Sequence, residues 1–509
     1  MRVLIFHGYL LQGTGSNVYN AELAAAFTRG GHEVHLLSQD RAPFALGWVD
    51  AAGDWDSGAL ELEVRRDPPR ATVYRPDIGG VLPLYVADRY EGVDARPFPE
   101  LSEAEVEAYV EHNVAAVREV VERARPDVAL ANHLVMGPAI LARALEDSGV
   151  PYAVKIHGSA LEYVVKPHSR FLPYAREGLA RASGVLVGSR HTAESLWAAM
   201  DEPALRGRTR LGPPGVDVDR FAPREPAVAR AGLVSLRDRL GAAEDATGGG
   251  DAFARSAGEA AAALAQVADG ERLVVYVGKL IASKGVELLL AAWPLVRARV
   301  PGARLLIVGF GAFRGGLEAL AAALARGDLE AARATRAETG AELPWLAAFL
   351  DRLGDGGAEA YAAAARAISG SVSWAGRLDH AELADVFPAA EAVAVTSTFP
   401  EAFGMVAAEG AACGALPVVA AHSGLAEVAR ALAAAIPEPA RPWLTFDVGP
   451  SAVEELAGAL ISWLQADRDL REETRSGMVA VTRERYSWDG VARTVIAAAR
   501  GELDALPNP

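Results

Sequence analysis

Short aliphatic runs alternate with longer helix-like stretches along most of the chain. They form two series, one at 3–6, 34–37, 128–130, 152–156 and 185–187, the other at 273–277, 304–308, 372–374, 392–395 and 416–419. The runs are apolar without polar alternation, as buried parallel strands are, and each is followed by a loop and a helical pattern. Two successive βα arrays predict an α/β chain with two doubly wound domains and a cleft between them.

The turn-rich stretch 211–217, Leu-Gly-Pro-Pro-Gly-Val-Asp, cannot continue a helix and predicts a domain boundary at 212/213. Two later segments interrupt the βα rhythm. Residues 228–270 are Ala-rich around the glycines 248–250, which predicts helical pieces about a flexible joint. Residues 312–371 have helical composition within one βα interval, so we expect a helical insertion there and regard it as a candidate surface for oligomerisation.

The net charge, the number of cysteines and the length of the apolar runs exclude several classes of protein. The 509 residues carry 50 Lys plus Arg against 66 Asp plus Glu, a net charge of −16, which argues against a nucleic-acid-coating protein. The single cysteine, Cys413, excludes an intramolecular disulfide and leaves too little sulfur for a structural zinc site, so we expect a core residue in a reducing compartment. No apolar run approaches the ~20 residues of a membrane helix. We therefore expect a soluble, cytoplasmic protein without stable membrane insertion.

Two glutamates eight residues apart, Glu401 and Glu409, follow the strand-like run 392–395. Pro400 and Gly404 bracket Glu401, so we expect it on a loop, with a helix from Phe403 that carries Glu409 on its second turn. Glu401 then lies by the N-terminus of the helix and Glu409 further along it, with backbone N–H groups between the two carboxylates. This arrangement fits a ligand that has hydroxyls at both ends and an anionic middle. Two solvated glutamates flanking an Ala-rich helix would show the same spacing.

Other strand-to-helix turns carry residues suited to an anion. Gly278 and Lys279 end one strand and Lys284 precedes the next helix, so both lysines can reach an anion at that helix N-terminus. Gly309 and Gly311 end another strand and permit close backbone approach to a ligand. Position 314 is Arg where a dinucleotide fingerprint needs glycine, which argues against NAD binding.

In their order these residues resemble the retaining glycosyltransferases of family 4 (glycosyl transferases group 1), which have the GT-B architecture of two Rossmann-like domains. The matching positions are Gly13 and Gly15, 157–159, 213–217, 278–279, 284–285, 309–311, Glu401 with Glu409, and 417–427. The resemblance implies an acceptor domain at 1–212, a nucleotide-sugar domain at 213–489, and a last helix within 490–509 that returns to the first domain. Trp488 is then a packing residue.

The resemblance also implies roles in the second domain. Lys279 and Lys284 match the pair that binds the donor diphosphate, although the family usually has Arg at position 279. Glu401 matches the carboxylate that contacts the donor sugar, beside the amides of Phe403, Gly404 and Met405. Glu409 matches the carboxylate that binds ribose hydroxyls. Gly376 and Arg377 fall where the backbone meets the base.

In the first domain, His157 matches a side chain near the reacting sugar, although a buried histidine at a strand end would look the same. Gly13 and Gly15 match a loop facing the donor phosphates. Asn132 and His133 end a strand on the acceptor side and are candidate acceptor contacts. Asp217 and Asp219 look like a metal-binding Asp-x-Asp but lie in the Pro-Pro-Gly turn, where we expect them to shape a loop, and we expect no metal.

The implied activity is transfer of a hexosyl unit from a nucleotide-diphosphate sugar to a hydroxyl of a small-molecule or glycan acceptor, with retention and without a cofactor. Lysines and helix N-termini would stabilise the charge on the departing diphosphate. Two alternatives stay open: a GT-B enzyme that epimerises or hydrolyses nucleotide sugars, and a catalytically silent nucleotide-sugar-binding scaffold.

Overall fold

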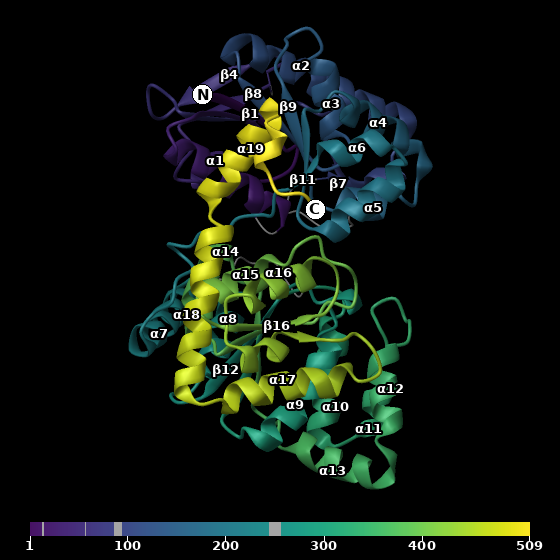
Figure 1. Cartoon of the computed structure of the whole chain (residues 1–509), viewed down its shortest axis with the longest axis vertical. Coiled ribbons are helices and arrows are strands. Elements are labelled where there is room, and N and C mark those ends of the chain that lie inside the picture. Colours follow the sequence, from purple (N-terminus) through teal and green to yellow (C-terminus); the bar gives the residue numbers. More distant parts are fainter. Residues whose placement is uncertain (13–14, 56, 86–93, 244–255) are drawn as a thin grey trace. The chain divides into compact units, whose positions relative to one another are not determined.

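The computed structural model describes residues 1–12, 15–55, 57–85, 94–243 and 256–509 (Figure 1). These residues divide into two compact units, Met1–Gly215 with Tyr486–Pro509, and Val216–Arg485. The boundaries expected from the sequence lie a few residues away. Each unit contains a mainly parallel sheet, and the expectation of an α/β chain with two Rossmann-like domains is confirmed.

The first unit contains a nine-stranded sheet in the order β11-β10-β9-β8-β1-β2-β5-β3-β4, in which only the β3–β4 pair is antiparallel. Its strands are β1 (Arg2–Phe6), β2 (Glu33–Leu37), β3 (Ala51–Asp54), β4 (Glu61–Val64), β5 (Ala71–Arg75), β8 (Val128–Asn132), β9 (Tyr152–Ile156), β10 (Gly184–Val187) and β11 (Thr209–Leu211). A separate parallel pair is formed by β6 (Val81–Leu84) and β7 (Asp94–Pro97). The strands β3 to β7 and β11 were not predicted. All of them except β5 have only three or four residues, and β4 is exposed along its length. The strand β5 is buried, but it reads Ala-Thr-Val-Tyr-Arg and lacks a continuous aliphatic run.

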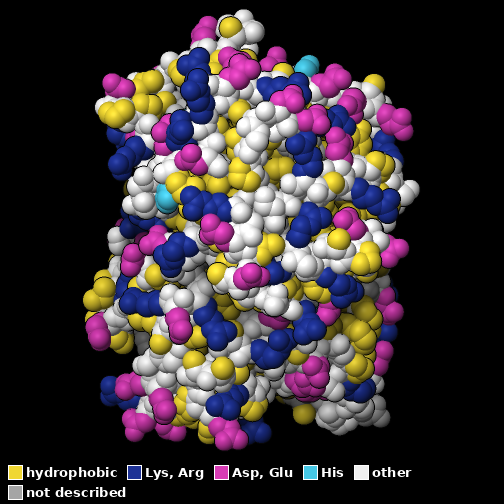
Figure 2. Space-filling view, turned by 45° about the horizontal axis from the view of Figure 1, so that its top comes forward, with side chains coloured by type: hydrophobic (Ala, Val, Ile, Leu, Met, Phe, Trp, Pro, Cys, Tyr) yellow, Lys and Arg dark blue, Asp and Glu magenta, His cyan; other side chains and the backbone are white. Residues whose placement is uncertain are grey.

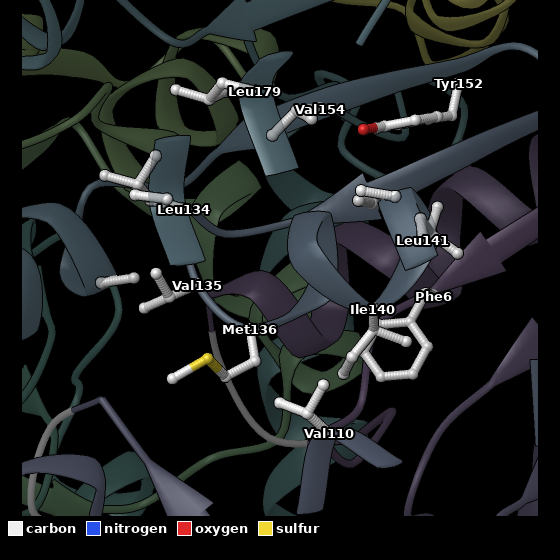
Figure 3. Close-up of a cluster of buried hydrophobic side chains, with 14 of the residues drawn as sticks. Phe6, Val110, Leu134, Val135, Met136, Ile140, Leu141, Tyr152, Val154 and Leu179 are labelled. Atoms are coloured by element: carbon white, nitrogen blue, oxygen red, sulfur yellow. The ribbon is translucent and has the colours of Figure 1, made fainter. Parts of the chain in front are cut away.

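Helices cover both faces of this sheet. Their bounds are α1 (Ser16–Arg29), α2 (Glu103–Ala124), α3 (Gly137–Ala144), α4 (Leu172–Ala180), α5 (Arg190–Met200), α6 (Pro203–Arg208) and α19 (Trp488–Arg500). Alternate residues of β1 face opposite ways: Val3 and Ile5 join the core under α1 and α19, whereas Leu4 and Phe6 join the core under α2, α3 and α4. Figure 3 shows part of the core under α2, α3 and α4, with Phe6 beside Ile140 and Leu141 of α3. The sheet is therefore buried on both faces.

The last helix belongs to the first unit because its apolar residues recur on one face. Trp488, Val491 and Val495 are buried, together with Ala492, Ala498 and Ala499. This is the i, i+3, i+4, i+7 pattern of an amphipathic helix. The buried face packs against α1, β8, β9 and β10. Figure 1 shows α19 beside α1 and these strands.

The second unit contains a six-stranded parallel sheet in the order β14-β13-β12-β15-β16-β17. Its strands are β12 (Arg272–Val277), β13 (Ala303–Val308), β14 (Val372–Gly376), β15 (Ala392–Val395), β16 (Leu416–Ala420) and β17 (Thr445–Phe446). Numbered from β12, this is the order 3-2-1-4-5-6 of the dinucleotide-binding fold. The order reverses between β12 and β15, and ligands of such sheets bind beyond the carboxyl ends of the strands at that point.

The helices of the second unit include the segment that was predicted as an insertion. Their bounds are α7 (Pro226–Ala242), α8 (Ala257–Ala265), α9 (Val286–Arg299), α10 (Arg314–Arg326), α11 (Leu329–Arg333), α12 (Pro344–Arg352), α13 (Gly354–Arg366), α14 (His380–Val386), α15 (Met405–Ala412), α16 (Ser423–Ala433), α17 (Ala452–Gln465) and α18 (Arg468–Arg485). The segment 312–371 is helical, but α10 and α13 pack against α9. The Tyr361 hydroxyl of α13 donates to the carbonyl oxygen of Ala291 (2.6 Å) in the interior. These two helices are therefore part of the unit's own helical layer.

The glycines 248–250, expected as a flexible joint, lie outside the described residues, whereas α7 and α8 on either side are helical as expected. Among the described residues, no helix is both long and apolar enough to cross a bilayer. On the face drawn in Figure 2, Lys and Arg side chains are interspersed with Asp and Glu side chains.

Candidate functional site

The loops after β12 and β15 are locked together at the point where the strand order of the second unit reverses. Gly285 has a φ of +64°, and a Cβ there would lie 2.1 Å from the carbonyl oxygen of Thr396. The Thr396 hydroxyl donates to the carbonyl oxygen of Lys284 (2.9 Å), and the Thr398 amide donates to that of Ser283 (2.9 Å). Only glycine fits this close approach, and the approach brings the lysine turn beside the glutamate loop.

Lys284 and Glu401 form an ion pair in this place, although they lie 117 positions apart in the chain. The Ser397 hydroxyl donates to the same carboxylate oxygen, Glu401 Oε1 (2.5 Å). Burial alone would raise the pKa of Glu401, but the charge of Lys284 and the hydrogen bonds from Lys284 and Ser397 hold that pKa below its ordinary value. Glu401 is therefore a fixed carboxylate anion beside a fixed ammonium group.

The backbone around Glu401 is held by the start of α16. The Glu401 amide donates to the Ser423 hydroxyl oxygen (2.9 Å), and the Gly424 amide donates to the Glu401 carbonyl oxygen (3.0 Å). His422 bonds through Nδ1 to the Ser423 hydroxyl (3.0 Å) and through Nε2 to the carbonyl oxygen of Ser397 (2.8 Å). Because Nε2 faces a carbonyl oxygen, it carries a proton and donates to that oxygen. Three loops thus fix the glutamate.

The helix after Glu401 begins at Met405, two residues later than the sequence predicted, because Gly404 caps it in a left-handed conformation (φ +118°). Phe403 is 6% exposed, so its side chain belongs to the core. Glu409 lies on the second turn, as predicted, and is 2% exposed. Its Oε1 lies 2.7 Å from Nε2 of His380, the first residue of α14.

The glycines of the neighbouring loops are needed for backbone packing. A Cβ at Gly309 would lie 2.1 Å from the Gly278 carbonyl oxygen, and one at Gly311 would lie 2.4 Å from the Leu280 carbonyl oxygen. A Cβ at Gly278 would lie 2.7 Å from the Tyr276 hydroxyl, which donates to the Lys279 carbonyl oxygen (3.0 Å). The loop that carries Lys279 therefore rests directly on the end of β13, and contact of these glycines with a ligand stays a prediction.

Gly376 and Arg377 end β14 beside the same loops. Gly376 has a φ of +62°, and a Cβ there would lie 2.8 Å from a carboxylate oxygen of Glu259. The Arg377 guanidinium lies over the ring of Phe310, 5.5 Å from its centroid. The structure thus brings both residues to the carboxyl edge of the sheet, and their contact with a base stays a prediction.

A carboxylate from the segment 312–371 also reaches the lysine turn. Both carboxylate oxygens of Glu338 accept from the Ala282 amide, at 3.0 and 3.3 Å. Ala282 is the first residue of the short 3-10 turn that ends at Lys284. This contact was not predicted, because nothing in the spacing of the chain links residue 338 to residue 282.

In the first unit, three histidines gather at the carboxyl ends of β1, β8 and β9. The ring centroids of His133 and His157 lie 4.9 Å apart, and those of His133 and His7 lie 5.9 Å apart. Both ring nitrogens of His133 are buried, and neither has a hydrogen-bond partner among the described residues. The first-unit strand order also reverses at this edge, between β1 and β8.

Asn132 orients one of these histidines. Its Oδ1 accepts from His157 Nε2 (2.8 Å), and its Nδ2 donates to the Phe6 carbonyl oxygen (3.1 Å) and to Asn20 Oδ1 (2.8 Å). Asn20 Nδ2 in turn donates to His7 Nδ1 (3.0 Å), so His7 carries its proton on Nε2. The hydrogen bonds of Asn132 are therefore made within the protein, which weakens its candidacy as an acceptor contact.

Burial keeps these histidines neutral. It lowers the pKa of His7 to about 4 and, together with the neighbouring charges, holds the pKa values of His133 and His157 well below the ordinary range. Burial also lowers the pKa of Lys155 on β9 to about 7. Lys155 Nζ donates to the Gly212 carbonyl oxygen (2.5 Å). The cluster thus offers neutral imidazoles rather than positive charge.

The loop of Gly13 and Gly15, expected to face the donor phosphates, is described only in part. Gly13 lies outside the described residues, and Gly15 precedes α1 with a φ of +62°. Asp217 accepts from the amides of Asp219 (3.3 Å) and Arg220 (3.1 Å), so its carboxylate shapes the turn. Among the described residues, no group of three His, Cys, Asp or Glu side chains has an arrangement that could hold a metal. Cys413 is buried at the end of α15, as expected.

Three residues at the second-unit edge were not predicted: Ser397, His422 and His380. Ser397 and His422 each lie two residues after the end of a strand, β15 and β16, so the rule that ligands bind at the carboxyl ends of strands applies to both. Nothing in the spacing of the chain pointed to His380.

Comparison with known proteins agrees with this geometry. The glycosyl transferase 4-like domain family matches residues 14–215, and the glycosyl transferases group 1 family matches residues 355–477. A D-inositol 3-phosphate glycosyltransferase of Segniliparus rotundus is 29% identical over 291 residues, 57% of this chain and 46% of that protein. A GDP-mannose-dependent phosphatidylinositol monomannoside mannosyltransferase of Mycolicibacterium smegmatis is 30% identical over 258 residues, 50% and 49% of the two chains. The matches thus span about half the length of these curated relatives.

Solved structures show the same fold over nearly the whole chain. Sucrose-phosphate synthase from Thermosynechococcus elongatus aligns with a TM-score of 0.59 at 20% identity, over 99% of this chain and 100% of that one. Anabaena HepE, in complex with UDP and glucose, aligns with a TM-score of 0.56 at 16% identity, over 99% of this chain and 100% of HepE. With two family models matched in order on two Rossmann-like units, the chain belongs to the family 4 type of glycosyltransferases with the GT-B fold.

Proposed function

We propose that the protein transfers a hexosyl unit from a nucleotide-diphosphate sugar to a hydroxyl acceptor, with retention of anomeric configuration and without a metal. The observation that carries the proposal is the Lys284–Glu401 pair at the point where the second-unit strand order reverses. One cation for a phosphate and one carboxylate for sugar hydroxyls lie there side by side. Glu409, eight residues further on, supplies the second carboxylate.

The charges are arranged for departure of a diphosphate. Lys284, Lys279 and the N-terminus of α15 supply positive potential where the leaving phosphate gains negative charge. The ion pair with Glu401 fixes the Lys284 ammonium group, so it needs little rearrangement to bind a diphosphate.

Retention is proposed because the described edge offers a poor nucleophile. Glu401 is the carboxylate that the proposal places beside the donor sugar, but Lys284 and Ser397 both bond to its Oε1, which reduces its nucleophilic character. Attack by the acceptor on the face from which the phosphate leaves, with that phosphate accepting the proton, requires no enzymatic nucleophile. In the first unit, the proposal keeps His133 as a candidate contact for the acceptor.

The relatives support a nucleotide-sugar donor, but they differ in the base and the sugar of that donor. HepE was solved with UDP-glucose, and the mycobacterial relative is described as GDP-mannose-dependent. We therefore propose thermal-shift screening against UDP- and GDP-sugars, followed by product analysis with and without acceptor. A rise in melting temperature with one donor class and a glycosylated product would support the proposal. Sugar release or epimerisation without acceptor would support a nucleotide-sugar hydrolase or epimerase instead, and absence of binding to every donor would overturn the proposal.

A further inference from the structure

His380 is the hydrogen-bond partner of the Glu409 carboxylate among the described residues, with Nε2 2.7 Å from Oε1. The Glu409 side chain is 3% exposed, and that of His380 is 20% exposed. We propose that His380 is a positioning residue that orients Glu409 toward the ribose hydroxyls of the donor and so makes the site prefer ribonucleotides over deoxyribonucleotides. The inference rests on the proposed function, because it requires a nucleotide donor in the second unit.

The imidazole is itself held in place. His380 is the first residue of α14, and Asp379 with Glu382 forms a capping box around that helix start. The His380 ring lies against Phe221, with centroids 5.0 Å apart, and Phe221 is fully buried beside Phe387. A capped helix end and an aromatic wall therefore fix the direction of Nε2.

Glu409 depends on such a partner because it is a buried carboxylate. A buried charged group is strongly disfavoured unless it is hydrogen-bonded. A carboxylate has about four acceptor positions, and the N–H of His380 occupies one of them on Oε1. The positions that remain suit the two adjacent hydroxyls of a ribose, which donate charge-assisted hydrogen bonds. Without His380, the carboxylate loses this donor, and its oxygens are no longer held in one orientation before the nucleotide binds.

The experiment compares nucleoside diphosphates that differ only in one ribose hydroxyl. Calorimetry of the full chain measures Kd for UDP or GDP, whichever the wild type binds, and for its 2′-deoxy and 3′-deoxy forms. His380→Ala should weaken binding of the ribonucleotide about tenfold, the loss of roughly one hydrogen bond to a charged group. It should weaken binding of at least one deoxy form much less, since that form lacks a hydroxyl that Glu409 binds.

Variants separate positioning from a structural role. His380→Gln places an N–H near the position of Nε2 and should restore most of the ribonucleotide affinity. In a Glu409→Gln background, His380→Ala should add little, because the two residues act as a unit. His112→Gln, at an exposed position of α2, serves as the matched control and should change no Kd.

The outcomes separate the inference from the proposed function. Equal weakening of ribo and deoxy forms by His380→Ala, or no weakening of either, would overturn the inference while leaving the proposed function intact. Loss of kcat at saturating donor with unchanged KM would also overturn it, because a residue that positions Glu409 acts on donor binding. If the wild type bound no nucleoside diphosphate, the proposed function would fail and the inference with it.

Discussion

Replacing Lys284 by alanine should reduce both stability and catalysis, and the two effects have different sizes. The change removes the ammonium that pairs with Glu401 and leaves that carboxylate with Ser397 as its remaining side-chain donor among the described residues. Because the charge of Lys284 helps to lower the pKa of Glu401, that pKa should rise in the variant.

The effect on stability follows from the exposure of the pair. The Lys284 and Glu401 side chains are 28% and 24% exposed, between an ordinary surface pair and a buried one. Surface pairs contribute about 0–1 kcal/mol, and loss of one partner of a buried pair costs about 3–5 kcal/mol, so we expect about 1–3 kcal/mol. For a unit of this size that corresponds to a decrease in melting temperature of roughly 2–10 °C. Removal of one charge that stabilises the leaving group should reduce kcat about 10²–10³-fold.

Thermal unfolding of a double-mutant cycle tests the reasoning. It uses Lys284→Ala, Glu401→Gln and the double variant, with kcat measured on each at saturating donor. Lys166→Ala is the control, because its partner is Glu162 in an i, i+4 pair with the lysine 44% exposed, so its loss should be barely measurable. Strictly additive effects of the two changes, or a Lys284→Ala enzyme as fast as wild type, would refute the role assigned to the pair.

Three further predictions concern pH, the segment 312–371 and metal. Burial lowers the pKa of His7 from 6.5 to about 4, so the unfolded chain binds a proton that the folded chain does not, and about 3 kcal/mol of stability should be lost as pH falls from about 6.5 to 4. Unfolding measured across that range should show less loss in His7→Gln, and identical slopes would contradict the assignment. Replacing the whole of 312–371 by a Gly/Ser linker should unfold the second unit, because α10 and α13 pack on α9. Shortening only 336–342, where Arg336 and Glu342 pair, should leave a folded protein that still binds nucleotide. Circular dichroism measures folding, and calorimetry measures nucleotide binding. The initial rate should be unchanged in EDTA, and a loss restored by magnesium or manganese would reopen the Asp217–Asp219 interpretation.

The sequence predicted the strands of the two sheets best where they are central and buried. The runs 3–6 and 273–277 are apolar throughout because both faces of each sheet are covered by helices. They form the strands β1 and β12 in the structure. The edge strand β4 reads Glu-Leu-Glu-Val and is exposed, so hydrophobicity gave no signal for it. Central strands are specified by burial, whereas edge strands depend on pairing with a neighbour that the sequence does not reveal.

At the candidate site, the sequence predicted which loops matter but not how their side chains pair. Pro400 and Gly404 on either side of Glu401 correctly indicated one glutamate on a loop and one on the following helix. The sequence could not indicate that Lys284 pairs with Glu401, or that His380 contacts Glu409, because each contact joins loops that only the folded sheet brings together. For the same reason the sequence could not indicate that the Asn132 amide bonds to Phe6 and Asn20, and its contact with an acceptor stays a prediction.

The anomeric configuration of the first product tests the central claim most directly. A donor of defined α-configuration, identified by the thermal-shift screen, is mixed with enzyme and acceptor and followed by proton NMR from the earliest turnover. An inverting enzyme needs a general base on the face opposite the leaving group. We expect an α-linked product, formed on the face from which the diphosphate departs. A β-linked first product would contradict the proposed retention of configuration and the role given to the Lys284–Glu401 pair.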